Sequence, residues 1–312
     1  METNRTLIPA DRVPSPRPAR AVARVVMAMD IPNKHILDTS AWNALFEDKR
    51  RDDLVAVLQT KVILPTSVAI TELAAIEDPE HRIAILQLVK TLGRDNRPLA
   101  TPNELIIMAC QGYSRHDAQI TLNAGNDAEG AWVALNKPEL VDDAAQLMAL
   151  KFNAERESVF RAWHEGLRSN LQGIFRAGTT RPRSMGALIR HYAQNDELLY
   201  EAINSIYERA VGAPLPRNQL WDLIRSLPHW RLFLAGHACA IYQRAVKAQG
   251  YGHGNNPGTL DLWSATYLPS CDIFVTKDKR QRRALKILNR HNPRSARILS
   301  YAEWRDTIPM TA

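Results

Sequence analysis

Short apolar runs alternate with helical patterns near the beginning of the chain. Residues 35–37 form an apolar run that ends at an aspartate, and residues 61–64 form a second, β-branched run. Between them, residues 41–58 place apolar side chains at helical spacing. Thr66 or Ser67 can then cap a further helix. This β-α-β-α order is typical of a parallel α/β sheet.

The C-terminal part of the chain repeats this alternation. Residues 257–259 predict a turn and a helix start, and residues 271–276 form an apolar run typical of a buried strand. Residues 280–290 carry a helical pattern, and residues 296–300 form a last short apolar run. The two ends of the chain are therefore expected to build one parallel sheet.

The middle of the chain has helical signals and few strand signals. Residues 101–104, Thr-Pro-Asn-Glu, are typical of the start of a helix. Residues 139–171 are rich in Ala, Leu, Glu and Arg. A helical run from Asp196 ends at Gly212, a residue that favours helix C-termini. The pattern therefore predicts an all-helical region in the middle.

These patterns divide the chain into three parts. Residues 1–34 are basic and rich in proline, without periodicity, and are expected to form a disordered lead-in. Residues 35–100 and 251–312 are expected to form an α/β domain with a parallel sheet. Residues 101–250 are expected to form a mostly α-helical insertion that interrupts this domain.

Composition favours a cytoplasmic protein without membrane spans. No apolar run approaches the roughly 20 residues that a membrane-spanning helix needs. The cysteines Cys110, Cys239 and Cys271 are widely scattered, which argues against a disulfide framework or a cysteine-based zinc site. A reducing cytoplasm fits this usage best. The net charge of +7 is compatible with a polyanionic partner.

Positive charge is concentrated near the C-terminus. Residues 277–297 hold nine Lys and Arg residues against the single acid Asp278. A solvated helix face is one interpretation of this segment, and a surface that contacts phosphates is the other. The candidates for nucleic-acid contact are Lys277, Lys279, Arg280, Arg282 and Arg283.

Four acids are expected to meet at one edge of the sheet. Asp38 ends the first strand, and Asp278 follows a buried strand. Glu72 and Asp261 lie in the first turns of predicted helices. Because strand C-termini and helix N-termini share one edge of a parallel sheet, all four acids should approach one another there. A lone aspartate after a strand is most often a helix cap, so it is the joint placement of the four acids that points to a site.

A cluster of like charges needs a physical reason. Neighbouring carboxylates raise each other's pKa and repel, and a divalent cation offsets this repulsion. Carboxylate oxygens are hard ligands that suit Mg²⁺ or Mn²⁺. Such ions can activate a water and stabilise the attacking and leaving oxygens of a phosphodiester displacement. The hydroxyls of Thr39, Ser40 and Thr276 are placed to support such ligands.

Four short segments follow one another in an order that matches a known signature. They are Ile36–Ser40, Thr66–Leu73, Asp261–Ala265 and Ile273–Asp278. Together they resemble the PIN-domain nuclease family. The resemblance implies a three-layer domain with a central parallel sheet, a Mg²⁺ or Mn²⁺ site of three or four acids, and cleavage of RNA, with some relatives acting on DNA. It implies catalytic and metal-ligand roles for Asp38, Glu72, Asp261 and Asp278, with Ser40 and Thr276 as supporting hydroxyls.

The chain departs from compact members of that family by the long stretch between Glu72 and Asp261. This insertion could clamp RNA, bind a protein partner or inhibitor, or cover the site. A haloacid dehalogenase-like phosphatase is disfavoured because it needs a second aspartate at the position of Ser40. No glycine-rich nucleotide-binding motif is present either.

The serious alternative to a nuclease is a PIN-like module that binds RNA or a protein without cleaving. Incubation of the protein with labelled single-stranded RNA and Mn²⁺, with and without EDTA, separates the two. A nuclease shortens the RNA, whereas a binding module only shifts its migration, with a marked salt dependence.

Overall fold

Four parallel strands form the sheet that the described part of the chain contains. The computed structural model describes residues 33–94, 97–116, 129–151, 153–154, 196–241 and 259–309. The strands are β1 (Lys34–Leu37), β2 (Val62–Ile63), β3 (Ile273–Thr276) and β4 (Arg297–Ser300). Their order in the sheet is β2-β1-β3-β4, and every pair is parallel. The mixed α/β class with a parallel sheet, built from both ends of the chain, is therefore confirmed.

The order of the strands reverses between β1 and β3. From β1 the chain moves outward to β2, and it later returns past β1 to form β3 and then β4. At such a reversal the connections leave in opposite directions, so the carboxyl ends of the two strands border a crevice. Leu37 pairs with Val275, and the N–H of Asp38 donates to Val275 O at 3.0 Å. Asp38 therefore leaves the sheet beside the end of β3.

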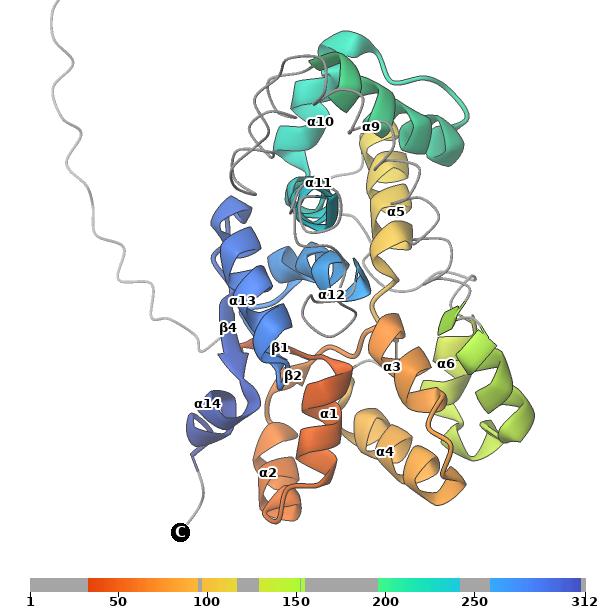
Figure 1. Cartoon of the computed structure of the whole chain (residues 1–312), viewed down its shortest axis with the longest axis vertical. Helices are drawn as coiled ribbons and strands as arrows, with labels where there is room; N and C mark the ends of the chain where they lie inside the picture. The colour runs from red at the N-terminus through yellow and green to blue at the C-terminus, as the bar shows by residue number, and fades with distance from the viewer. Residues whose placement is uncertain are drawn as a thin grey trace, which may run out of the picture. The chain divides into compact units, whose positions relative to one another are not determined.

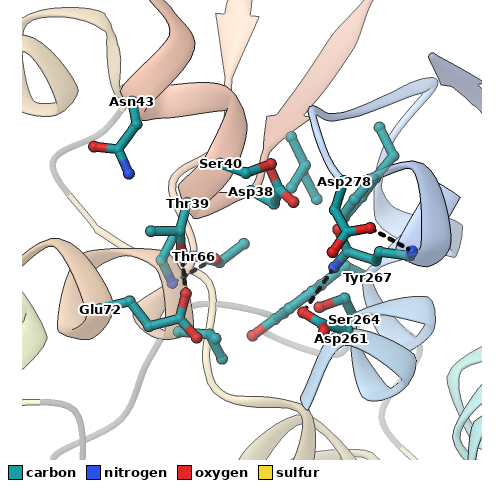
Figure 2. A pocket seen from close by; sticks show the side chains of 15 residues that line it. Asp38, Thr39, Ser40, Asn43, Thr66, Glu72, Asp261, Ser264, Tyr267 and Asp278 are labelled. Atoms are coloured by element: carbon teal, nitrogen blue, oxygen red, sulfur yellow. Dashed lines mark hydrogen bonds between the residues drawn. The ribbon is translucent and has the colours of Figure 1, made fainter. Parts of the chain in front are cut away.

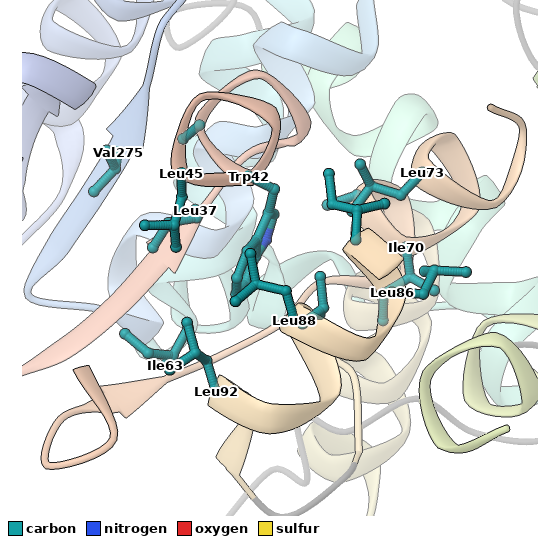
Figure 3. Packing of buried hydrophobic residues seen from close by; sticks show 14 of the residues in the cluster. Leu37, Trp42, Leu45, Ile63, Ile70, Leu73, Leu86, Leu88, Leu92 and Val275 are labelled. Carbon is teal, nitrogen blue, oxygen red and sulfur yellow. The ribbon is translucent and has the colours of Figure 1, made fainter. Parts of the chain in front are cut away.

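One face of the sheet packs against helices from the N-terminal half and the C-terminal end. Alternation along the strands turns Leu37 and Val275 to this face. Figure 3 shows both residues in the cluster around the fully buried indole ring of Trp42. The helices on this face are α1 (Thr39–Phe46), α2 (Arg51–Leu58), α3 (Ser67–Ala74), α4 (Pro79–Leu92) and α14 (Tyr301–Asp306).

The other face packs against a different set of helices, drawn on the opposite side of the strands in Figure 1. Ile36 and Phe274 point into this second cluster. Leu105 and Leu232 join them from helices that the sequence assigned to the insertion. The elements on this face are α5 (Pro102–Ser114), α11 (Pro228–Ile241), α12 (Thr259–Trp263), the 3-10 helix η6 (Ser264–Ser270) and α13 (Lys279–Leu288).

The remaining described helices pack on these two sets. A third cluster forms around Trp230 and Phe233, whose rings lie 5.7 Å apart. Gly212 ends α9 with a φ of 81°, as expected for a helix C-terminus. None of the described helices is both long and apolar enough to cross a bilayer. The additional elements are α6 (Glu129–Asn136), η3 (Pro138–Leu140), α9 (Asp196–Val211), η4 (Arg217–Gln219), α10 (Leu220–Ser226) and η7 (Asn289–His291).

The helical pattern expected over residues 41–58 is present, and it is divided into two helices, α1 and α2. The break lies at Asp48, whose Oδ1 accepts from the N–H of Arg50 at 2.9 Å. The hydroxyl of Tyr301 donates to Asp48 Oδ2 at 2.9 Å. An Asp side chain that binds the nearby backbone competes with helical hydrogen bonds. The tertiary contact to Tyr301 then holds the aspartate in this turn between the two helices.

Some predictions lie outside the described residues. They concern the disordered lead-in over residues 1–32, the helical run over residues 155–171, the turn at residues 257–258 and the end of the insertion at residues 242–250. The first strand begins at Lys34, one residue earlier than expected. The predicted helix start at Thr101 is confirmed, because Thr101 and Glu104 form a reciprocal capping box.

A buried histidine is expected to make the fold sensitive to acid. The indole N–H of Trp304 donates to His35 Nδ1 at 2.9 Å, which requires that nitrogen to be unprotonated. Burial is the main cause that lowers the pKa of His35 from 6.5 to about 4. Between these values the unfolded chain binds a proton that the folded protein does not. The free energy of unfolding should therefore fall as the pH falls from 6.5 toward 4, by about 2–3 kcal/mol for this group.

Urea unfolding of the wild type and of His35→Gln at pH 7 and pH 4.5 measures this contribution. Glutamine can still accept from the Trp304 indole and does not titrate. The wild type should lose more stability than the variant between these pH values. An equal loss in both proteins would show that His35 does not cause the acid sensitivity.

Candidate functional site

A pocket opens at the carboxyl ends of β1 and β3, where the strand order reverses (Figure 2). All four acids that the sequence singled out line this pocket, although they come from four separate segments. Asp38 follows β1, and Asp278 lies between β3 and α13. Glu72 lies on α3, and Asp261 lies in the first turn of α12. The structure therefore brings the four predicted acids together at the predicted edge of the sheet.

Asp38 is a helix cap as well as a pocket residue. Its Oδ1 accepts from the N–H of Ala41 and from the hydroxyl of Ser40, both at 2.8 Å. Burial is the main cause that raises the pKa of the Asp38 carboxyl from 3.8 to about 6, and the charge of Glu72 makes a smaller contribution in the same direction. The hydrogen bonds from Thr276, Ala41 and Ser40 oppose this shift without cancelling it. The ionised carboxylate is thus held where the surrounding protein does not fully compensate its charge.

The two predicted supporting hydroxyls join the ends of β1 and β3. Ser40 Oγ accepts from the N–H of Lys277 at 2.8 Å and lies 3.4 Å from Thr276 Oγ1. Thr276 Oγ1 accepts from the N–H of Asp278 at 3.0 Å. These bonds connect the first turn of α1, which follows β1, to the residues between β3 and α13. They therefore fix the positions of Asp38 and Asp278 relative to each other.

The other carboxylates also bind neighbouring donors. The hydroxyl of Thr39 donates to Glu72 Oε2. Asp278 caps α13, and its Oδ1 accepts from the N–H groups of Arg280 at 2.6 Å and Gln281 at 3.1 Å. Figure 2 shows Glu72 facing Thr39 on one side of the pocket, with Asp261 and Asp278 on the other side. The four acids thus surround the pocket from opposite sides.

Gln281 is a pocket residue that the sequence analysis missed. Its side chain is only 2% exposed, and its Nε2 lies 3.5 Å from Asp261 Oδ1. Its Oε1 is buried and has no hydrogen-bond partner within the described part of the chain. A buried acceptor that faces no protein donor is costly unless water or a ligand supplies one. The signal was available, because Gln281 is the polar member of an otherwise apolar buried face of α13. That face also contains Ala284, Leu285 and Leu288.

The pocket fits a hard divalent cation by ligand type and by charge. None of its described lining residues is Lys, Arg or His, so four carboxylates have no basic side chain among them. Oxygen donors of this kind suit Mg²⁺ and Mn²⁺. Within the described residues, no three acidic, His or Cys side chains are arranged to hold one ion. Each of the four carboxylates is instead turned to a protein donor. Asn43, Ser264 and Tyr267 complete the polar lining.

The five candidate nucleic-acid residues separate into two groups. Lys277 is exposed and its Nζ lies 3.8 Å from Glu47 Oε2 in an ion pair, and Arg280 is also exposed. The other three line a second hollow on α13. The residues of that hollow are Lys279, Arg282, Arg283, Lys286, Ile287 and Arg290.

No protein-family model, curated protein or solved structure matches this chain. The interpretation of the pocket rests therefore on its own residues and on their arrangement in the sheet.

Proposed function

We propose that the protein is a divalent-metal-dependent nuclease that hydrolyses phosphodiester bonds, with RNA as its substrate. The observation that carries this proposal is the pocket at the reversal of strand order. Its described lining contains four carboxylates and no basic side chain. Carboxylates gathered in this way repel one another, and a bound cation would offset that repulsion. A hydrolase that uses Mg²⁺ or Mn²⁺ explains why the fold maintains this cluster of carboxylates.

The arrangement of the sheet and helices supports a PIN-like three-layer domain. Helices pack on both faces of the parallel sheet, and the four acids follow the order in the chain that the PIN signature has. The helical region between Glu72 and Asp261 is then a large insertion, available to bind RNA, a protein partner or an inhibitor. The three described cysteines are unpaired, which supports a place in the reducing cytoplasm.

In this proposal Asp38, Glu72, Asp261 and Asp278 hold the metal. A bound divalent ion lowers the pKa of water and neutralises charge on the reacting phosphate. The residues of the chain supply the positions. Ser40 and Thr276 fix the two carboxylates at the strand ends. Glu72 can exchange its bond to Thr39 for a ligand position by rotating its side chain.

Gln281 would act beside these ligands as a positioning residue. Its amide nitrogen lies toward Asp261, which leaves its buried oxygen able to accept from a water or from a substrate hydroxyl. Cations on α13 would hold the flanking phosphates as contacts that carry no sequence information. The family resemblance implies products with a 5′-phosphate and a 3′-hydroxyl.

The proposal is tested with purified protein and end-labelled single-stranded RNA. Cleavage should require Mn²⁺ or Mg²⁺ and stop in EDTA. Asp261→Asn should lower the rate by about 100-fold, because a lost ligand removes part of several kcal/mol of electrostatic stabilisation. A single-stranded DNA of the same sequence, assayed alongside, tests the preference for RNA.

Asp272→Asn is the matched control. Asp272 precedes β3 at the opposite edge of the sheet, where its Oδ2 accepts from the N–H of Lys34 at 2.8 Å. This variant should cleave like the wild type. Cleavage that persists in EDTA or in Asp261→Asn would contradict the metal site. RNA that is bound but stays intact would identify the non-catalytic binding module instead.

A further inference from the structure

The exposed side of α13 carries cations at helical spacing. Lys279, Arg282, Arg283 and Lys286 lie on α13, and Arg290 follows on η7. Positions separated by three or four residues lie on one face of a helix, so these five residues form a single row. We call this row the α13 stripe. It lines one hollow together with Ile287, while the opposite side of α13 is buried against the sheet.

Acidic residues in the described part of the chain compensate the positive charge of the α13 stripe only in part. Arg282 forms an ion pair with Glu303 at 2.6 Å. The other four members have no salt bridge to any residue in the described part of the chain. The charge of Lys286 acts on Glu303 from a longer range. The neighbouring cations of the stripe still repel one another, and a polyanion would relieve this repulsion. The chemistry of the stripe therefore points to a ligand with several phosphates in a row.

The α13 stripe begins at the acidic pocket. Asp278, which lines that pocket, is the N-cap of α13, and Lys279 is the next residue. From Lys279 to Arg290 a helical path covers about 16 Å, at 1.5 Å per residue. A polyanion that lies along this path has one of its ends at the four carboxylates. A polynucleotide fits this arrangement if its reacting phosphate lies at the pocket and its following phosphates lie along the α13 stripe.

An apolar side chain lies among these cations. Ile287 is 36% exposed and lines the same hollow. A duplex presents mainly phosphates and sugars to a helix on its surface, and its bases are stacked inside. A single strand exposes bases that can pack on apolar side chains. Phosphate contacts combined with an apolar contact therefore favour a single strand.

We infer that the α13 stripe cradles a single-stranded polynucleotide that leads into the acidic pocket. Its phosphates contact Lys279, Arg283, Lys286 and Arg290, and a base packs on Ile287. This inference rests on the proposed nuclease function for the end at the pocket. It also separates the members of the basic segment, because Lys277 and Arg280 lie outside the hollow.

Binding is tested on the full chain in EDTA, by fluorescence anisotropy with a labelled oligonucleotide of about 12 nucleotides. Single-stranded RNA, single-stranded DNA and a duplex of equal length form the three arms. Four phosphate contacts predict a slope of about −3 for the logarithm of affinity against that of salt concentration. Arg283→Gln/Lys286→Gln should reduce the slope to about −1.4 and weaken binding about 20-fold near 0.1 M salt.

Two further variants make the test specific. Ile287→Ser should weaken single-strand binding about fivefold without changing the slope, because it removes an apolar contact and no charge. Lys34→Gln/Lys61→Gln removes two charges at the opposite edge of the sheet and should bind like the wild type. An equal loss in this control, an unchanged slope in Arg283→Gln/Lys286→Gln, or tighter binding of the duplex would overturn the inference.

Because binding is measured in EDTA, it does not depend on metal or on cleavage. If the stripe variants lose binding and the wild type fails to cleave with Mn²⁺, the inference stands and the nuclease proposal fails. If the wild type cleaves and Arg283→Gln/Lys286→Gln cleaves with unchanged KM, the inference fails and the nuclease proposal stands. A preference between RNA and DNA identifies the sugar that the cradle accepts.

Discussion

Replacing Asp38 with asparagine is expected to slow cleavage strongly and to stabilise the metal-free protein at the same time. Asparagine keeps the shape of the side chain and still caps α1 by accepting from the N–H of Ala41. It removes a carboxylate that burial and Glu72 both disfavour. Loss of one ligand should lower the cleavage rate by about 100-fold to 1000-fold. Relief of the buried charge should raise the free energy of unfolding by about 1–2 kcal/mol at pH 8.

The stabilisation has a defined pH dependence. The pKa of Asp38 is raised from 3.8 in the unfolded chain to about 6 in the folded protein. The folded protein therefore binds this proton more tightly, and ionisation of Asp38 costs stability as the pH rises from about 4 through 6. The advantage of Asp38→Asn should be present at pH 8 and absent at pH 4.

Thermal or urea unfolding of both proteins in EDTA measures this difference, with Asp272→Asn as the control. Saturating Mn²⁺ should reverse the order, because it stabilises the wild type and has little effect on the variant. If Asp38→Asn is less stable than the wild type at pH 8 in EDTA, the ionised Asp38 carboxylate does not lower the free energy of unfolding. Its place in a metal site then loses its physical basis.

The meeting of the four acids could be predicted because it follows from local rules. An apolar run that ends in Asp38 and a second that precedes Asp278 identify strand ends. Parallel strands place such ends at one edge. The order β2-β1-β3-β4 was not predicted, because it depends on packing between segments far apart in the chain. That order determines that the pocket lies between the ends of β1 and β3. The chemical role of the acids stays a prediction.

Other features depended on contacts that a linear pattern does not contain. The break at Asp48 requires Tyr301, which is more than two hundred residues away in the chain. The packing of α5 and α11 on the sheet likewise joins distant segments. The basic segment is a different case. Helical phase alone separates Lys279, Arg283 and Lys286 from Arg280, so the stripe could have been read from the sequence.

Replacing the buried Arg82 with methionine is expected to cause the largest loss of stability of any single change considered for this protein. Arg82 is 1% exposed, and its guanidinium donates to four acceptors. Its Nη1 donates to Ile76 O at 2.7 Å and Glu77 O at 3.2 Å, and its Nε donates to Val141 O at 3.1 Å. Its Nη2 lies 3.1 Å from Asp143 Oδ1. This one side chain therefore ties the connection between α3 and α4, and the segment at residue 141, to α4.

Methionine matches the stem of Arg82 but leaves the three carbonyls without their donor. Each such loss costs about 1–3 kcal/mol, and the sum should reach about 3–5 kcal/mol. Urea unfolding at pH 7 with an unchanged m-value measures it. Arg51→Met is the matched control. Its exposed pair with Asp52, its 3.4 Å bond to Phe46 O and its contact with the Phe46 ring should together contribute less than about 1 kcal/mol. A loss below about 1 kcal/mol for Arg82→Met would show that water replaces the guanidinium. The segment at residue 141 would then be held mainly by its apolar contacts to α4, and not by these hydrogen bonds.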